Sequence, residues 1–155
     1  MIRVLFVCLG NICRSPMAEC IFGRLLREAG LEGQVCAASA ATSTEALGCD
    51  IHRGARQKLR EEGVPFSPRQ ARQVQRQEYG QWDYIVGMEA RNVAALRRIF
   101  GGDPAGKLHR LLDFSERPRD IADPWYTDNF DEAYADILEG CEALLAHLRP
   151  SLEKI

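Results

Sequence analysis

The chain has 155 residues, 46% of them hydrophobic, which lets one domain bury an adequate core without disulfides or metals. Twenty basic residues nearly offset twenty-two acidic ones, so the charge gives no reason to expect nucleic acid or an anionic membrane as a partner. The amino-terminal residues lack a secretory pattern, and no apolar run reaches membrane-spanning length. We therefore expect one cytoplasmic domain over residues 1–155.

The six cysteines are compatible with free thiols, since a domain of this size in a reducing compartment does not need disulfides. None of their spacings is C-x-x-C, and the three histidines do not fall beside paired cysteines at zinc-finger separations. We expect no metal and no cofactor, several buried thiols and one reactive thiol.

Predicted strands and helices alternate along the chain. Residues 3–8 form an apolar run rich in β-branched and aromatic side chains, which is typical of a buried parallel strand. A turn with Gly10 and Asn11 follows, and Ser15-Pro16 marks the start of a helix over residues 17–29. Later patterns predict strands at 34–40, 84–88 and 107–114 and helices at 51–62, 89–100 and 131–148.

This alternation predicts an α/β fold in which a four-stranded parallel sheet is flanked by helices on both faces, as in Rossmann or flavodoxin-like proteins. Ligands of such sheets bind beyond the carboxyl ends of the strands, where the turn after residue 8 lies. The segment 115–129 is too irregular for a regular element, yet it contains Trp125 and Tyr126. Long loops of this kind are often functional.

The turn from Cys8 to Ser15 has the features of an anion-binding loop. Its backbone N–H groups can point inward, and the following helix adds the positive end of its dipole. Arg14 can hold two phosphate oxygens, the positive environment favours a Cys8 thiolate, and Ser15 can donate a hydrogen bond to the sulfur. The Cys-to-Arg spacing alone is weak evidence, because it also arises by chance between a core cysteine and a surface arginine. The strand-turn-helix context makes phosphate binding the better interpretation.

Attack of a thiolate on phosphorus requires a leaving group that can accept a proton, so a general acid should reach the same pocket. Asp123 is the best candidate. It precedes Pro124, which restrains the backbone, and two aromatic residues that can form walls around a flat leaving group. Taken alone, an Asp-Pro pair more often just begins a turn.

Two motifs resemble the low-molecular-weight protein tyrosine phosphatases. The first is VCLGNICRSP at residues 7–16, and the second is DPWY at residues 123–126. Residues 39–43 and 83–88 are also similar to the family's second and third strand regions, so the resemblance covers nearly the whole chain.

The resemblance implies hydrolysis of phosphotyrosine in proteins, and of small aryl phosphates, through a cysteinyl-phosphate intermediate. Cys8 would be the nucleophile, Arg14 and the loop amides would bind the phosphoryl oxygens, and Asp123 would protonate the leaving phenolate and then activate water. Asn11, bonded to Ser39, would hold the loop in a strained conformation. The implied substrate-binding residues are those of the loop and the two aromatics: Leu9, Gly10, Asn11, Ile12, Cys13, Arg14, Ser15, Trp125 and Tyr126.

The resemblance carries further expectations. Ser15 would stabilise the thiolate, and Cys13 would pair reversibly with Cys8 and protect it from over-oxidation. The loop would bind phosphate or other oxyanions, and the protein would be a monomer or weak dimer. Three positions depart from the family pattern: a histidine near Pro68 is missing, Glu89 stands where many relatives have aspartate, and Trp125 replaces a more familiar tyrosine.

Three alternative functions are compatible with some of the same residues. Thioredoxin-linked arsenate reductases resemble this fold, but they need further cysteines in a close downstream pair, which this chain lacks. Protein-arginine phosphatases carry a small polar residue where this chain has Ile12, whose apolar side chain suits an aromatic ring. A non-catalytic phosphate-binding module would need the loop but would have no use for a positioned acid.

Overall fold

The computed structural model describes residues 1–152, so residues 153–155 of the expected domain lie outside it. Four parallel strands form one sheet in the order β2-β1-β3-β4. The strands are β1 (Ile2–Cys8), β2 (Val35–Ala41), β3 (Tyr84–Gly87) and β4 (Leu108–Arg110). This order confirms the predicted four-stranded parallel sheet.

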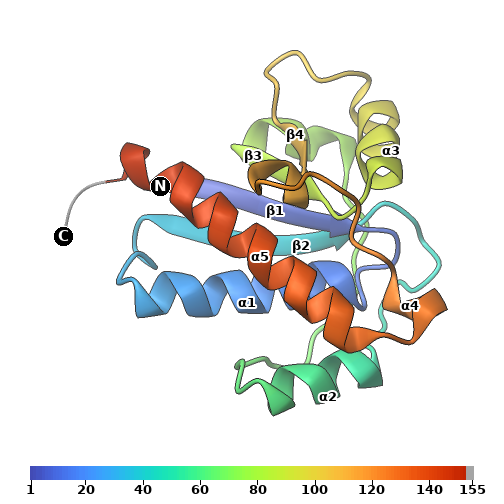
Figure 1. The fold of residues 1–155 in the computed structure, drawn as a ribbon. Coiled ribbons are helices and arrows are strands. Elements are labelled where there is room, and N and C mark those ends of the chain that lie inside the picture. The colour runs from blue at the N-terminus through green and yellow to red at the C-terminus, as the bar shows by residue number, and fades with distance from the viewer. Residues whose placement is uncertain (153–155) are drawn as a thin grey trace.

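Helices cover both faces of the sheet (Figure 1). The α-helices are α1 (Arg14–Glu28), α2 (Arg53–Glu61), α3 (Ala90–Phe100), α4 (Pro124–Thr127) and α5 (Phe130–Leu148). Three short 3-10 helices are η1 (Arg76–Gln81), η2 (Leu111–Phe114) and η3 (Arg149–Ser151). No helix of residues 1–152 is both long enough and apolar enough to cross a membrane.

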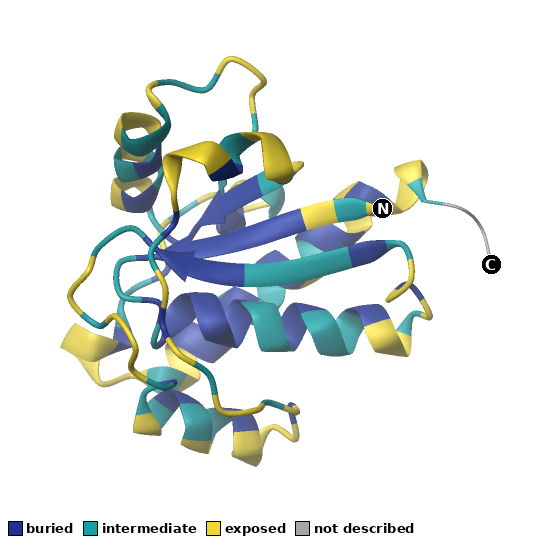
Figure 2. Ribbon diagram, turned by 180° about the vertical axis from the view of Figure 1, so that it is seen from behind, coloured by how far each residue is buried: buried dark blue, intermediate teal, exposed yellow. Residues whose placement is uncertain are grey.

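The central strand β1 is buried on both faces, which explains its unbroken apolar sequence. Val4 and Phe6 pack into the larger core with α1 and α5, whereas Leu5 and Val7 face the smaller core with α3. Figure 2 shows this buried centre and the exposed outer surfaces of the helices. Helices therefore pack against both faces of β1, and this packing fixes the position of the strand's carboxyl end.

The strand order creates a crevice where that strand ends. The chain leaves β1 toward β2 on one side and later returns to β3 on the other side of β1. Loops that follow β1 and β3 therefore diverge at the carboxyl edge, which is the place where open α/β sheets bind ligands. Cys8 is the last residue of β1.

One predicted strand is wrong over most of its length. Residues 107–114 were expected to form a strand, but β4 has only three residues and η2 follows directly. Leu111 and Leu112 are neighbours in the chain and both pack into the same larger core, whereas consecutive residues of a strand point to opposite faces of the sheet. Asp113 accepts a hydrogen bond from the Arg110 N–H and closes the helical turn.

Two other elements differ from the sequence expectation. The segment 115–129, expected to be irregular, contains the four-residue helix α4, whose start is capped because Asp123 accepts a hydrogen bond from the Trp125 N–H. Helix α1 begins at Arg14, three residues before the expected position 17. A helix of four residues such as α4 is too short to show a helical period in the sequence.

Gly140 allows α5 to pack closely on η2, because a Cβ at this position would overlap the buried Leu111 side chain. We expect Gly140→Ala to lower the free energy of unfolding by about 1–3 kcal/mol, the usual cost of overpacking. Gly23→Ala in α1 is the matched control, since its Cβ would meet only the Arg27 guanidinium at 3.4 Å and should stabilise the helix by about 0.5–1 kcal/mol. Urea unfolding of both variants measures the difference. Equal stability of the two variants would contradict the packing argument.

Candidate active site

The loop after β1 is held in an unusual conformation at Asn11. Asn11 has φ 58°, in the left-handed region that non-glycine residues rarely adopt. Its side chain offsets this strain, because Nδ2 donates to Ser15 Oγ at 2.8 Å and to Ser39 Oγ at 2.9 Å. The Arg72 N–H donates to Asn11 Oδ1 at 3.3 Å. The bond to Ser39 expected from the sequence is therefore present.

Cys8 lies at the bottom of this loop and is almost completely buried. The Asn11 N–H donates to its sulfur at 3.3 Å, and Ser15 Oγ lies 3.0 Å from the same sulfur. Because Ser15 Oγ already accepts from Asn11 Nδ2, its own hydroxyl proton is available for the sulfur. Two hydrogen-bond donors, close to the amino end of α1, thus face the Cys8 sulfur.

A second group of polar residues supports the loop from behind. Ser39 Oγ donates to Glu19 Oε1 at 2.8 Å and accepts from an Arg69 guanidinium nitrogen at 2.9 Å. Arg69 and Glu19 also form an ion pair with each other. Arg69 directly follows Pro68, near which the histidine expected from the family resemblance is missing. Neither Glu19 nor Arg69 carries a local sequence signal for this role, because only the folded sheet brings them to Ser39.

Arg14 is buried and joins three segments of the chain. One of its terminal nitrogens donates to the Ile121 carbonyl at 2.7 Å and to Glu89 Oε2 at 3.2 Å, and the other donates to Asp123 Oδ2 at 3.3 Å. Glu89, which departs from the aspartate of many relatives, still reaches Arg14. The planar guanidinium group is thereby fixed beside the loop.

Asp123 occupies the position expected of a group that acts on a ligand in the loop. It forms the cap of α4, where Pro124 restrains the backbone at the first helical position. One carboxylate oxygen accepts from the Trp125 N–H at 3.0 Å, and the other faces Arg14. The sequence motif thus places Asp123 at the same point as Cys8 and Arg14.

The three residues meet at a cavity of about 160 Å³, which suits a small group rather than a large cofactor. Its lining residues are Cys8, Leu9, Gly10, Ile12, Cys13, Arg14, Glu45, Ala46, Asp123, Trp125 and Tyr126. Two expected substrate-binding residues, Asn11 and Ser15, do not line it, because their side chains bond to each other behind the loop. Glu45 and Ala46 were missed; they follow β2, and only the sheet order places that loop beside the Cys8 loop.

Two aromatic side chains form the exposed rim of the cavity. Trp125 is 60% exposed and Tyr126 is 76% exposed. The Trp125 ring contacts the His52 ring edge-on at 5.6 Å, and His52 stacks on Phe130 at 5.5 Å. Trp125 is therefore supported by neighbouring rings, whereas most of the Tyr126 ring faces solvent.

The second cysteine of the loop differs from the first. Burial raises the pKa of the Cys13 thiol to about 12, and the negative charges of Cys8 and Asp123 add to this effect while Arg14 opposes it. Cys13 therefore remains a neutral thiol at physiological pH although it lines the same cavity. All six cysteines of the chain lie in its described part and are free thiols.

Comparison with known proteins agrees with this geometry. The family described as low molecular weight phosphotyrosine protein phosphatase matches residues 3–154. The low molecular weight protein-tyrosine-phosphatase YfkJ of Bacillus subtilis is 46% identical over 151 residues, which cover 96% of this chain and 97% of YfkJ. The corresponding enzyme PtpA of Staphylococcus aureus is 35% identical over 149 residues, or 96% of this chain and 94% of PtpA.

Solved structures show the same relationship. The crystal structure of Bacillus subtilis YfkJ superimposes with a TM-score of 0.95 at 45% identity and covers 99% of this chain and 98% of its own. A Drosophila arginine phosphatase, DARP, superimposes with a TM-score of 0.86 at 30% identity, covering 94% of this chain and 97% of its own. The family expected from the two sequence motifs is confirmed: the chain belongs to the low molecular weight phosphotyrosine protein phosphatases.

Proposed function

We propose that this chain hydrolyses phosphotyrosine in proteins, and small aryl phosphates, through a cysteinyl-phosphate intermediate. The observation that carries this proposal is the convergence of Cys8, Arg14 and Asp123 at one small cavity. A module that only bound phosphate would need the loop and the arginine, but it would have no use for a carboxyl group at the mouth of the cavity.

In the first step the Cys8 thiolate attacks phosphorus and the bond from phosphorus to the phenolic oxygen breaks. Arg14 and the loop N–H groups bind the non-bridging oxygens, and Asp123 gives its proton to the departing oxygen. Glu89 and the Ile121 carbonyl hold one edge of the Arg14 guanidinium group.

In the second step water attacks the phosphorus of the cysteinyl-phosphate. Asp123, now ionised, accepts a proton from this water, the sulfur-phosphorus bond breaks, and inorganic phosphate leaves. The hydrogen bonds from Ser15 and from the Asn11 N–H stabilise the Cys8 thiolate that is regenerated. The same loop therefore holds Cys8 as the nucleophile of the first step and stabilises its thiolate as the leaving group of the second step.

The composition of the cavity favours an aromatic substrate. Leu9, Ile12 and Trp125 present apolar surface around the catalytic loop. The likeness to an arginine phosphatase lies in the shared fold, whereas Ile12 supplies an apolar contact that suits a phenyl ring. Cys13 is the only cysteine besides Cys8 among the described residues that line this cavity, which argues against the multi-thiol relay of arsenate reductases.

We also propose that Cys13 protects the nucleophile from over-oxidation. A peroxide would oxidise the Cys8 thiolate to a sulfenic acid, and Cys13 sulfur would then displace water from it to form a disulfide. Both side chains line one cavity, which supports this reaction.

We further propose that residues 1–155 act as one cytoplasmic domain, as a monomer or weak dimer. The six free thiols support a reducing compartment.

The roles of the nucleophile and the acid can be tested with phosphotyrosine, phosphoserine and phosphoarginine peptides. We expect turnover selective for phosphotyrosine, no turnover by Cys8→Ser, and a loss of about 10²–10⁴-fold in Asp123→Ala, the usual contribution of a general acid. Phosphate release on the three peptides measures this. Activity that survives in Cys8→Ser, or that is confined to phosphoarginine, would contradict the proposal.

The role of Ile12 in selectivity can be tested by making this position polar. We expect Ile12→Thr to lower kcat/KM for phosphotyrosine relative to phosphoarginine by about 10-fold, which is the scale of one lost apolar contact in a binding pocket. Ile12→Val keeps an apolar side chain and should change this ratio little. The two kcat/KM values are measured on one preparation of each variant. An unchanged ratio in Ile12→Thr would show that Ile12 does not set selectivity.

A further inference from the structure

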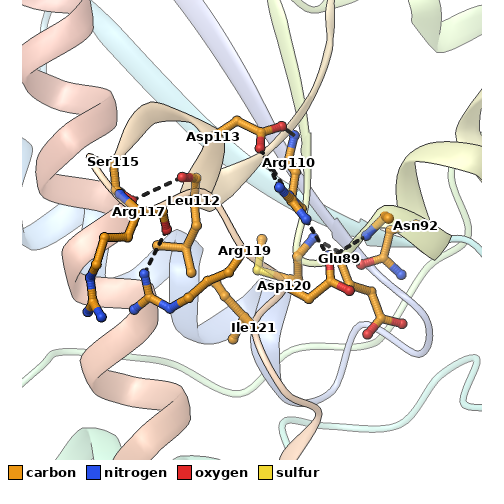
Figure 3. A network of polar contacts seen from close by, with 12 residues as sticks. Glu89, Asn92, Arg110, Leu112, Asp113, Ser115, Arg117, Arg119, Asp120 and Ile121 are labelled. Atoms are coloured by element: carbon orange, nitrogen blue, oxygen red, sulfur yellow. Dashed lines mark hydrogen bonds and ion pairs between the residues drawn. The ribbon is translucent and has the colours of Figure 1, made fainter.

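The segment that leads to Asp123 is fastened to the rest of the molecule on both sides, and Figure 3 shows its contact with Arg110 through Asp120. On one side, Arg119 donates to Asp136 at 2.8 Å and to Glu139 at 3.0 Å, both on α5. In the middle, Ile121 is fully buried, and its N–H donates to the Met88 carbonyl at 3.0 Å. The backbone before Asp123 is thus anchored within a few residues of the proposed acid.

Asp120 makes the contacts on the other side. Its Oδ1 accepts from the Ala90 N–H at 2.9 Å and from an Arg110 terminal nitrogen at 3.0 Å. Burial raises the pKa of Asp120, but the hydrogen bonds from Ala90 and Arg110 outweigh it and hold this pKa below its ordinary value. The carboxylate is therefore charged at neutral pH, as its ion pair with Arg110 requires.

These contacts place Asp120 at a junction between the acid segment and the arginine support. Ala90 is the first residue of α3, and its N–H has no partner within the helix. The preceding residue, Glu89, is the one that pairs with Arg14. Asp120 thus fastens the acid segment to the same helix end from which Glu89 reaches Arg14.

The position of the acid depends on this fastening because α4 offers little support of its own. The helix has four residues, and only Pro124 among them is buried. Apart from the bond that caps this short helix, the Asp123 carboxylate pairs with one side chain within residues 1–152, that of Arg14. Substrate phosphate would compete for that arginine, so the backbone anchors must keep the carboxyl in place during turnover.

We propose that Asp120, together with Arg110, is a positioning residue that sets where the Asp123 carboxyl meets the leaving oxygen. The inference rests on the proposed acid role of Asp123. A displacement of about 1 Å in a catalytic group can cost on the order of 10²-fold in rate. A solvent-exposed ion pair without this role would contribute little to either stability or rate.

The test compares two substrates that differ in their need for an acid. Phenyl phosphate releases a weakly acidic phenol and depends on proton donation, whereas p-nitrophenyl phosphate releases a more acidic phenol and depends on it less. We expect Asp120→Ala to lower kcat/KM for phenyl phosphate about 10-fold more than for p-nitrophenyl phosphate. Asp120→Asn should have a smaller effect, since its amide oxygen can still accept the Ala90 N–H. The ratio of the two values on one preparation is independent of the fraction of folded enzyme.

Two further variants test whether the effect of Asp120 on the substrate ratio depends on Arg110. Arg110→Gln should change the ratio in the same direction as Asp120→Asn and should add little to it in the double variant. Asp113→Asn is the matched control: Asp113 is the other carboxylate partner of Arg110, and its loss should leave the ratio within about twofold.

The Asp123→Ala variant separates failure of this inference from failure of the proposed function. If Asp123→Ala does not change the substrate ratio, the acid role itself is wrong. If Asp123→Ala changes the ratio and Asp120→Ala does not, only the positioning role is wrong. An equal loss on both substrates in Asp120→Ala, or the same ratio change in Asp113→Asn, would also overturn the positioning role.

Discussion

The buried positive charge of Arg14 is the constraint on which the rest of this site depends. A guanidinium group away from water needs oxygen partners, and its removal from solvent is costly without them. In this protein the partners come from Glu89 and from the Ile121 carbonyl and Asp123 of the acid segment. A single side chain thereby fixes the relative positions of α1, the start of α3 and the proposed general acid.

The loop that contains Cys8 illustrates how strain is balanced locally. The left-handed backbone at Asn11 is unfavourable by itself, yet the same conformation brings its N–H to the sulfur. Side-chain bonds to Ser15 and Ser39 hold it there, and the Arg69–Glu19 ion pair supports Ser39 in turn. The conformation that the nucleophile needs is thus maintained by groups that never contact the cavity.

Local sequence signals predicted the parts of this arrangement that are encoded within a few residues. The apolar run before Cys8, the loop to Ser15 and the Asp123 motif each appear in one short stretch. Glu19, Arg69 and Glu45 carry no such signal, because their roles arise only when the strand order brings separate loops to one edge. The misassigned strand after residue 107 has a similar cause: consecutive leucines look alike in a strand and in a buried 3-10 turn, and only packing against α5 distinguishes them.

The order of the parts along the chain has a consequence for biosynthesis. The nucleophile and its arginine belong to the first strand and helix, whereas the carbonyl that binds Arg14 comes 107 residues later. A nascent chain that has emerged only through α3 therefore has a Cys8 loop without the Asp123 carboxyl and with Arg14 incompletely paired. A chain still being synthesised therefore lacks the proposed general acid, and two partners of Arg14, until residues 121–123 have emerged.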